Sequence, residues 1–178
     1  MINGQSVLAV VPARGGSKRV PRKNLRRFRG TQLLEWTRLA AKASRYIDLI
    51  ALSTEDAEIK TANNYGIVID RPEELATDDA SSEDVLRHAL AQFPAYDWVV
   101  LLQLTSPLRI AEDIDACIER AQMGNGCFST YMGKTNGAVY VASAEWIAEH
   151  DFNHLGLLKH AMPEERSLDI DEESDFGK

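Results

Sequence analysis

The sequence predicts an α/β sandwich built on a mostly parallel central sheet. Its apolar runs, such as SVLAVV at 6–11, contain no polar alternation, so they fit strands that are covered on both faces. Helical patterns lie between these runs, and alternation of strand and helix at these lengths is typical of parallel strands joined by right-handed crossovers. The chain of 178 residues is long enough for a single domain with a substantial core.

The predicted elements follow one another in a regular order. Apolar and β-branched runs are assigned to strands, and longer amphipathic segments are assigned to helices. They are a strand at 6–11, a helix at 33–44, a strand at 47–53, a helix at 54–66, a strand at 67–69, a helix at 82–93, a strand at 97–103, a helix at 111–122, strands at 127–131 and 137–142, and a short helix at 143–150. Gly66 is placed at the end of the second helix, and Ser81 or Ser82 caps the third. The pattern after Asn153 predicts no definite element.

The overall composition is that of a globular protein, with 44% hydrophobic and 26% charged residues. Cys117 and Cys127 show no metal-ligand spacing and are expected to be free thiols in a reducing compartment. No run reaches the roughly 20 apolar residues that a membrane span requires, and the first residues lack a basic segment ahead of their short apolar run. We therefore expect a cytoplasmic protein without a membrane partner.

Positive charge is concentrated near the start of the chain. The net charge is −7 and the pI is about 5.1, yet residues 1–34 contain eight Lys or Arg and no acidic residue. Binding to nucleic acid normally requires a broader basic surface and an alkaline domain. The pattern instead favours a small polyanion such as a nucleotide as the ligand, with no nucleic-acid partner.

The segment PARGGSKRVPRKN at 12–24 carries most of this charge in one loop after the first strand. Gly15 and Gly16 allow backbone N–H groups to approach phosphate oxygens, and Arg14 with Lys23 can neutralise their charge. The order of residues is neither that of a Walker loop nor that of a dinucleotide-binding fingerprint. A solvated basic loop without a ligand is the alternative to a phosphate site.

Two further loops are expected at the same edge of the sheet, because ligands of open α/β sheets bind beyond the carboxyl ends of the strands. In RPEELATDDASSED at 71–84, Asp78 and Asp79 are equally consistent with plain surface charge. In LLQLTSPLR at 101–109, polar residues follow directly on a buried strand, and a turn around Pro107 explains only part of this pattern. These polar residues are Gln103, Thr105, Ser106 and Arg109.

The acidic segment SLDIDEESD at 167–175 offers a candidate metal site. In extended backbone, residues at i and i+2 project to the same side, so Asp169 and Asp171 can share a hard divalent cation. A solvated acidic tail is the alternative interpretation. The combination of this pair with a basic phosphate loop favours a Mg²⁺ site.

Taken together, the motifs resemble those of the N-acylneuraminate cytidylyltransferases, which make CMP-activated sialic acid and related nonulosonic acids. The resemblance is close over residues 7–115. It is carried by PARGGSKRVPRKNL, STEDAEI, RPEELATDDASS and LLQLTSPLRIAEDID, and it resumes in TNGAVYV and LDID. It implies a three-layer α/β sandwich of the nucleotide-diphospho-sugar transferase type, with CTP, Mg²⁺ and a sugar acid taking part in the reaction.

The resemblance also implies roles for individual residues. Arg14, Lys23, Asp169 and Asp171 would be catalytic, since they would neutralise the triphosphate and hold the metal. The nucleotide would be bound by Ala13, Arg14, Lys18, Lys23, Asn24, Arg71, Ala80 and Ser82. The sugar acid would face Gln103, Thr105, Ser106, Arg109 and Asn136.

Two departures from the family pattern bear on this interpretation. Leu104 stands where the motif usually has a proline, which is expected to loosen the loop that orients Gln103. The stretch near 110–136 is much shorter than in typical members, where it supplies dimer contacts and part of the acceptor pocket. We therefore expect a single domain over 1–178, with an intact nucleotide half, a shortened acceptor half and a weaker or altered homodimer.

The leading hypothesis is a cytidylyltransferase that transfers CMP from CTP to a nonulosonic acid and releases pyrophosphate. A related nucleotidyltransferase with a different sugar-acid acceptor is one alternative. A CTP-binding relative without catalytic activity is the other, and the shortened acceptor half is the argument for both.

Overall fold

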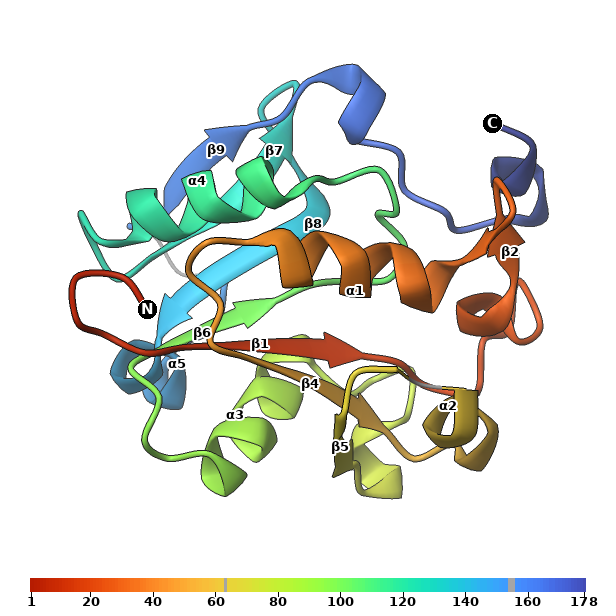
Figure 1. The fold of residues 1–178 in the computed structure, drawn as a ribbon, viewed down its shortest axis with the longest axis horizontal. Coiled ribbons are helices and arrows are strands. Elements are labelled where there is room, and N and C mark those ends of the chain that lie inside the picture. Colours follow the sequence, from red (N-terminus) through yellow and green to blue (C-terminus); the bar gives the residue numbers. More distant parts are fainter. Residues whose placement is uncertain (63, 154–155) are drawn as a thin grey trace.

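A seven-stranded sheet forms the centre of the molecule in the computed structural model, which describes residues 1–62, 64–153 and 156–178 (Figure 1). The strand order is β5-β4-β1-β6-β8-β7-β9, and β8 alone runs antiparallel to its neighbours within this described sheet. The predicted mostly parallel sheet is therefore confirmed. The strands are β1 (Val7–Pro12), β4 (Leu49–Thr54), β5 (Ile67–Asp70), β6 (Trp98–Leu101), β7 (Gly126–Tyr131), β8 (Lys134–Ser143) and β9 (Leu158–Ala161).

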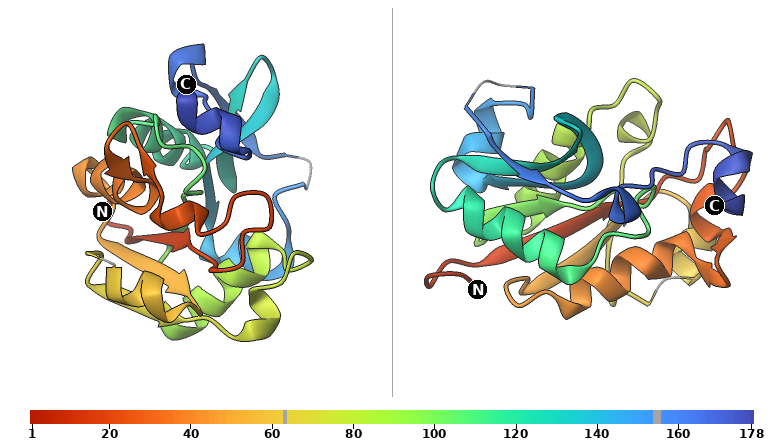
Figure 2. Two further views of the ribbon diagram at one scale, coloured as in Figure 1. Left: turned by 90° about the vertical axis from the view of Figure 1, so that its right-hand side faces the viewer. Right: turned by 90° about the horizontal axis from the view of Figure 1, so that it is seen from above.

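Helices cover both faces of the sheet, which gives the three layers that the sequence predicts (Figures 1 and 2). Helices α1 (Leu33–Ala43) and α4 (Ala111–Ala121) pack on one face. Helices α3 (Ser82–Gln92) and α5 (Ala144–Glu149) pack on the other. Within the described ranges, no helix has the length and apolar character needed to cross a lipid bilayer.

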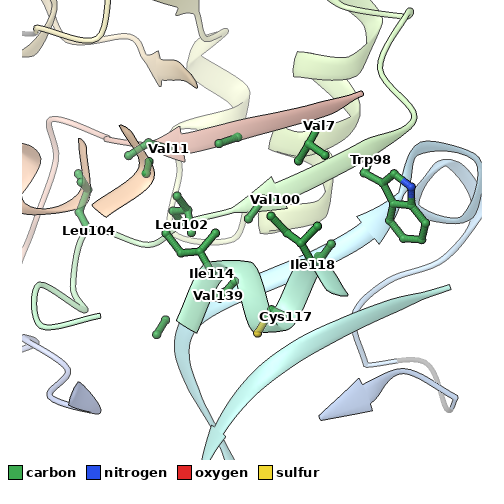
Figure 3. Packing of buried hydrophobic residues seen from close by; sticks show 14 of the residues in the cluster. Val7, Val11, Trp98, Val100, Leu102, Leu104, Ile114, Cys117, Ile118 and Val139 are labelled. Carbon is green, nitrogen blue, oxygen red and sulfur yellow. The ribbon is translucent and has the colours of Figure 1, made fainter. Parts of the chain in front are cut away.

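The apolar run of β1 is continuous because both faces of this strand are buried. Val7 and Val11 join the core beneath α1 and α4, whereas Leu8 and Val10 join the core beneath α3 and α5. Figure 3 shows Val7 and Val11 on the same side as Ile114 of α4. Burying one such side chain contributes about 1.5–3 kcal/mol to folding, so a polar residue on either face of β1 would be costly.

Helix α2 (Ala57–Ala62) begins later than the predicted start at residue 54. Thr54 instead ends β4, and its hydroxyl oxygen accepts a hydrogen bond from the Asp56 N–H at 3.1 Å. The Asp56 carboxylate accepts from the Ile59 N–H at 2.9 Å, so Asp56 caps the helix. The predicted helix also included residue 63, which lies outside the described residues. Ser81 caps α3, as one of the two predicted alternatives required.

The end of the chain forms elements that its sequence pattern did not predict. These are β9 and the 3₁₀ turns η3 (Glu164–Arg166) and η4 (Glu173–Gly177). The tail packs against a small hairpin of β2 (Arg27–Phe28) and β3 (Thr31–Gln32), which the sequence pattern also did not predict. Ile170 is fully buried in a separate small core with Phe28 and Leu33. This burial holds the tail against a segment near the start of the chain.

A tight turn joins β7 to β8, within the stretch that the sequence predicts to be shortened. Met132 and Gly133 form this two-residue turn, and both have positive φ angles, of 49° and 78°. Such turns match the twist of antiparallel strands. The chain thereby passes directly from β7 into β8 and brings Tyr140 beside Leu101 at the end of β6.

Candidate active site

A pocket of about 320 Å³ lies beyond the carboxyl ends of β1, β5 and β6. These strands run in parallel, so the loops that follow them meet at one edge of the sheet (Figure 1). The predicted site residues that line this pocket are Arg14, Lys23, Asn24, Arg71, Ala80, Ser82, Gln103, Thr105 and Asp171.

The loop after β1 approaches the end of β4 so closely that Gly15 is required. A Cβ at residue 15 would lie 2.2 Å from a carboxylate oxygen of Asp56. The Gly15 N–H donates to the Glu55 carboxylate at 2.7 Å, and the Arg71 guanidinium donates to the same carboxylate at 2.8 Å. Burial alone would raise the pKa of Glu55, but these hydrogen bonds outweigh burial and hold the pKa below its ordinary value. Glu55 thus fixes the loop and Arg71 in one arrangement.

Arg22 anchors the far end of the same loop. Its guanidinium makes two hydrogen bonds to the Asp56 carboxylate, at 2.7 and 3.1 Å, and also contacts Glu58. These bonds lower the pKa of Asp56. Because Arg22 points to α2, the basic loop divides into cations that hold its shape and cations that face the pocket.

Arg14 and Lys18 share one carboxylate, that of Asp78 on the loop between β5 and α3. Arg14 Nη1 lies 2.7 Å from Asp78 Oδ1 and 3.1 Å from the Thr77 carbonyl oxygen, and Lys18 pairs with the other Asp78 oxygen. The contact with Lys18, followed by that with Arg14, lowers the pKa of Asp78. All three side chains are substantially exposed, so an anionic ligand can reach the two cations. Lys18 itself lies outside the pocket lining.

Lys23 joins the loop to the tail of the chain. Its ammonium group donates to the Ile170 carbonyl oxygen at 2.9 Å and to the Asp171 carboxylate at 3.2 Å. Arg19 approaches the second oxygen of Asp171 at 2.9 Å. The structure therefore places Asp171 beside Lys23, although 148 positions separate them in the chain.

Asp169 lies at the other side of the same tail segment. The neighbouring Ile170 N–H donates to the Thr105 carbonyl oxygen at 2.7 Å, which draws the segment to the end of β6. Residue 169 is exposed as a whole, yet loss of hydration around its carboxyl group and the nearby charge of Asp171 raise the pKa of Asp169.

Asp169 and Asp171 offer the oxygen ligands that suit Mg²⁺ or Mn²⁺. Asp171 lines the pocket, whereas Asp169 lies outside its lining. No group of three or more His, Cys, Asp or Glu side chains in metal-binding arrangement occurs in the described part of the chain. A metal held by Asp169 and Asp171 would therefore need further ligands from phosphate oxygens or water.

The remaining predicted nucleotide residues shape the loop from within. Ala13 is fully buried, and its N–H donates to the Ser53 carbonyl oxygen at 2.9 Å. The Asn24 amide donates to the Arg14 carbonyl oxygen at 2.9 Å and borders the pocket. The side chain of Ala13 thus lies beneath the loop, while Asn24 holds the backbone that carries Arg14.

Three predicted sugar residues lie outside the pocket lining. Ser106 and Arg109 are buried, and the Arg109 guanidinium is directed to protein carbonyl groups. The Asn136 side chain accepts from Ser129 at 2.6 Å and donates to Ser167 at 3.1 Å. Arg109 and Asn136 thus support the pocket wall through protein contacts, whereas the buried Ser106 hydroxyl has no hydrogen-bond partner among the described residues.

Leu104 follows Gln103 directly and takes the place of the motif's proline. Its side chain is only 3% exposed and packs in the core beneath α1 and α4. Burial holds this side chain in place. The loosening expected from the missing proline stays a prediction.

Sequence reasoning assigned no role to Glu55 and Asp56, and it left Asp78 as plain surface charge. Glu55 and Asp56 directly follow the buried strand β4, in the motif STEDAEI. Gln103 drew attention for the same reason, because it follows a buried strand. That signal would have found the carboxylate that fixes Arg71, whereas the contact of Asp78 with Arg14 depends on tertiary structure.

Comparison with known proteins places these features in a family context. The model of the cytidylyltransferase family matches residues 8–149. The N-acylneuraminate cytidylyltransferase of Escherichia coli O18:K1:H7 is 30% identical over 211 residues, covering 96% of this chain and 50% of that protein. The CMP-N,N'-diacetyllegionaminic acid synthase of Legionella pneumophila is 39% identical over 120 residues, covering 64% of this chain and 52% of that protein.

A solved structure shows the same fold at a similar length. Rv0371c from Mycobacterium tuberculosis, in complex with manganese, has a TM-score of 0.72 at 19% identity and covers 97% of each chain. By contrast, this chain spans about half the length of the curated relatives above. The alignment with the E. coli protein covers 211 residues, more than the 178 of this chain, so that relative contains internal segments that are absent here.

Proposed function

We propose a function from one premise: the chain belongs to the cytidylyltransferase family. The proposed reaction transfers CMP from CTP to a nonulosonic, sialic-type acid and releases pyrophosphate. One observation carries this proposal. The pocket combines exposed cations, the Gly15 loop and the Arg71 guanidinium at the carboxyl ends of parallel strands, next to the polar residues Gln103 and Thr105. A triphosphate and a hydroxylated acceptor fit these two kinds of wall.

The basic loop is proposed to bind the triphosphate. Arg14 and Lys23 would exchange their carboxylate partners, Asp78 and Asp171, for phosphate oxygens. Asn24, Arg71, Ala80 and Ser82 border the same space and would place the nucleoside part. The exposed Arg14–Asp78 pair favours this exchange, because exposed pairs contribute only about 0–1 kcal/mol and a triphosphate offers several anionic oxygens.

The transfer itself requires little covalent chemistry from the protein. A hydroxyl oxygen of the acid would bond to the α-phosphorus, the bond from that phosphorus to the bridging oxygen would break, and pyrophosphate would leave with the electron pair. The hydroxyl proton would be lost to solvent. Lys23 and Arg14 would stabilise the charge that develops on the leaving group, and Gln103 with Thr105 would orient the acid.

Mg²⁺ is the proposed cofactor, and Asp169 with Asp171 would hold it. When bound there, a divalent cation supplies charge neutralisation at the phosphate that is transferred. Asp171 contacts Lys23, and the segment that carries both carboxylates is held to Thr105 through the Ile170 N–H, which supports this role. Arg19 and Lys23 would then lose their contacts with Asp171.

We further propose that the enzyme is cytoplasmic and forms a homodimer. This dimer would be weaker than that of its longer relatives, or it would use a different surface. The two free, buried cysteines support a reducing compartment. The tight turn at Met132-Gly133 leaves no long segment between β7 and β8, which supports an altered dimer. Sedimentation at micromolar concentration tests the dimer, and a tight dimer whose interface includes residues 120–136 would contradict it.

Nucleotide selectivity and pyrophosphate release test the proposed reaction. Thermal-shift titrations with CTP, UTP, ATP and GTP should give the largest stabilisation for CTP, and equal stabilisation by all four would remove the cytidylyl assignment. Pyrophosphate release is then measured with CTP, Mg²⁺ and a panel of N-acetylneuraminic, legionaminic, pseudaminic and 2-keto-3-deoxy-octonic acids. Release with an acid of the sialic type supports the proposal. Release only with the octonic acid favours the related enzyme with another acceptor, and CTP binding without release with any acid favours the non-catalytic relative.

A further inference from the structure

The Gln103 side chain is a polar group that borders the pocket without a protein partner. It is half-buried, and the described part of the chain makes no hydrogen bond to its carboxamide. A carboxamide carries two donors and one acceptor oxygen, and leaving it unsatisfied while partly buried is unfavourable. A ligand in the pocket can therefore gain hydrogen bonds from Gln103 without displacing any protein contact.

Arg109 holds the backbone of Gln103 from below. Its Nη1 group donates to the Gln103 carbonyl oxygen at 2.7 Å and to the Ala138 carbonyl oxygen at 2.8 Å, and its Nη2 group contacts the Thr37 hydroxyl. One guanidinium thus joins the end of β6 to β8 and to helix α1. The fixed fork of donors makes such a three-way contact specific for arginine.

Burial of Arg109 makes its role hard to explain by packing alone. The residue is 2% exposed, no ion pair to it occurs among the described residues, and its Nε group has no hydrogen-bond partner. Burial lowers the pKa of Arg109 to about 10, so it remains charged at neutral pH. Burying a charge destabilises the fold unless its hydrogen bonds compensate for the lost hydration. An apolar side chain would fill this space with a smaller loss of stability.

Gly137 fixes the side chain of Gln103 from the opposite strand. A Cβ at residue 137 would lie 2.8 Å from Gln103 Oε1, so the carboxamide rests directly on the glycine. Gly137 also has a φ of 75°, which favours glycine on its own. The backbone therefore favours glycine at residue 137, and a Cβ there would force the end of the Gln103 side chain to move.

We propose that Arg109 and Gly137 are positioning residues that together hold Gln103 in the orientation that reads the acceptor. Arg109 fixes the main chain and Gly137 fixes the carboxamide. The identity of the acceptor rests on the proposed function, whereas the placement of Gln103 does not. Loss of either restraint should therefore affect the acceptor and leave CTP binding, which uses the opposite wall, nearly unchanged.

A pair of glycine variants separates this role from backbone strain. Gly137→Ala and Gly133→Ala impose similar strain, because Gly133 has a φ of 78° in the same hairpin, but a Cβ at residue 133 meets no atom within 4 Å. With the acid that gives the highest rate, Gly137→Ala should lower kcat/KM for the acid by roughly 10- to 100-fold, as expected for misplacement of a binding group by about 1 Å. Gly133→Ala should leave it within about threefold.

A double-mutant cycle with Gln103→Ala assigns the effect to Gln103. If Gly137 acts through this side chain, Gly137→Ala should have little further effect in the Gln103→Ala background beyond the effect of Gly133→Ala. Additive losses, or equal losses for the two glycine variants, would overturn the proposal. The affinity for CTP, measured by calorimetry, should change less than threefold in every variant.

Arg109→Lys and Arg109→Met test the second restraint. We expect both variants to raise the KM for the acid and to accept more of the acids in the panel. A lysine keeps the charge but lacks the fork of donors, so Arg109→Lys should retain more of the native preference than Arg109→Met. A fall in thermal stability without a change in KM or in preference would show that Arg109 is only structural and would overturn its part.

A measurement without the acceptor keeps the two proposals separate. The Gln103 side-chain amide signal in a ¹H–¹⁵N spectrum, assigned by its loss in Gln103→Ala, should shift in Gly137→Ala and in Arg109→Lys but not in Gly133→Ala. If no acid releases pyrophosphate, the proposed function fails while these shifts still support the positioning of Gln103. An unchanged signal in Gly137→Ala would overturn the positioning whatever the activity.

Discussion

The two walls of the pocket are built on different physical principles. The proposed phosphate side is lined by Arg14 and Lys23, with Lys18 just outside, and these cations are paired with the carboxylates of Asp78 and Asp171. On the proposed acceptor side, Gln103 lines the pocket as an open polar group, and Arg109 and Gly137 contact it from outside the lining. The first side can exchange partners, whereas the second is fixed in place.

This difference indicates how the two sides would respond to change. Charge acts over distance and tolerates small displacements, so loss of one cation weakens binding without abolishing it. Hydrogen-bonded placement depends on geometry within fractions of an ångström, so loss of one restraint affects selectivity. Variants on each side should therefore separate nucleotide affinity from acceptor use.

The largest effect is expected for Asp171→Asn, because this residue lies where the two sides meet. The change keeps the size and removes one proposed anionic metal ligand, so turnover should fall by about a hundredfold or more, as expected if the cation contributes several kcal/mol at the transition state. Turnover of CTP with the preferred acid measures it. Asp79→Asn is the matched control, since Asp79 is exposed and does not line the pocket. An unchanged rate in Asp171→Asn would mean that the carboxylate belongs only to an acidic tail.

The next largest effect is expected on the phosphate side. Lys23→Ala should weaken CTP binding roughly 10- to 150-fold, the range that corresponds to about 1.5–3 kcal/mol for a charge-assisted contact. The KM for the acid should change little. Calorimetry compares it with Arg27→Ala, which removes an exposed cation that does not line this pocket. Equal CTP affinity in wild type and Lys23→Ala would make the basic loop a solvated surface.

Asp78→Asn should have a smaller effect in the opposite direction. Removing this carboxylate frees Arg14 and Lys18 from their ion pairs, so CTP should bind about 2- to 10-fold more tightly, consistent with the modest stabilisation of exposed pairs. The gain should shrink as salt is added. Weaker binding at low salt would show instead that Asp78 orients Arg14 for the nucleotide.

The smallest effect concerns the tail that carries the acidic pair. The contact with Lys178, followed by the N–H groups of residues 172 and 171, lowers the pKa of Asp175 to about 2. A group whose pKa falls on folding stabilises the fold above its unfolded pKa of about 3.9, and this contribution is lost as the pH falls toward 2. Urea unfolding should therefore give a lower free energy of unfolding for Asp175→Asn than for wild type at pH 7. This difference in free energy should disappear between pH 4 and pH 2. A gap independent of pH would contradict this.

Much of the fold could be predicted because its signals are local. The run of Val7, Leu8, Val10 and Val11 alone indicates a strand covered on both faces, and the structure buries it there. The start of α2 was misplaced because Asp56, rather than Thr54, caps the helix. Caps of this kind depend on which polar side chain turns back to the backbone, and two neighbouring candidates look alike in sequence.

The tail could not be assigned for a different reason. Its order depends on the burial of Ile170 against Phe28 and Leu33 and on the contact of its Asp171 with Lys23. The partners lie near the start of the chain, and no pattern inside the tail reveals them. Elements held by distant contacts are therefore the ones that sequence patterns miss.

The same distinction applies to the site. The motifs located the residues that the structure gathers around one pocket, because charged and polar groups after buried strands are visible in sequence. They could not tell that the Arg109 side chain is buried against Thr37 and Ala138, since a polar residue in the right loop can face either the ligand or the protein. The direction of a side chain is decided by packing.

One measurement tests the central claim, transfer of the cytidylyl group, most directly. The protein is mixed with CTP, Mg²⁺ and N-acetylneuraminic acid, and with each other acid of the panel, and the phosphorus signals are followed by ³¹P NMR. The account predicts that the α-phosphorus signal moves to that of a CMP ester while free pyrophosphate appears in equal amount. Formation of CDP and inorganic phosphate, or CTP that persists unchanged with every acid, would contradict it.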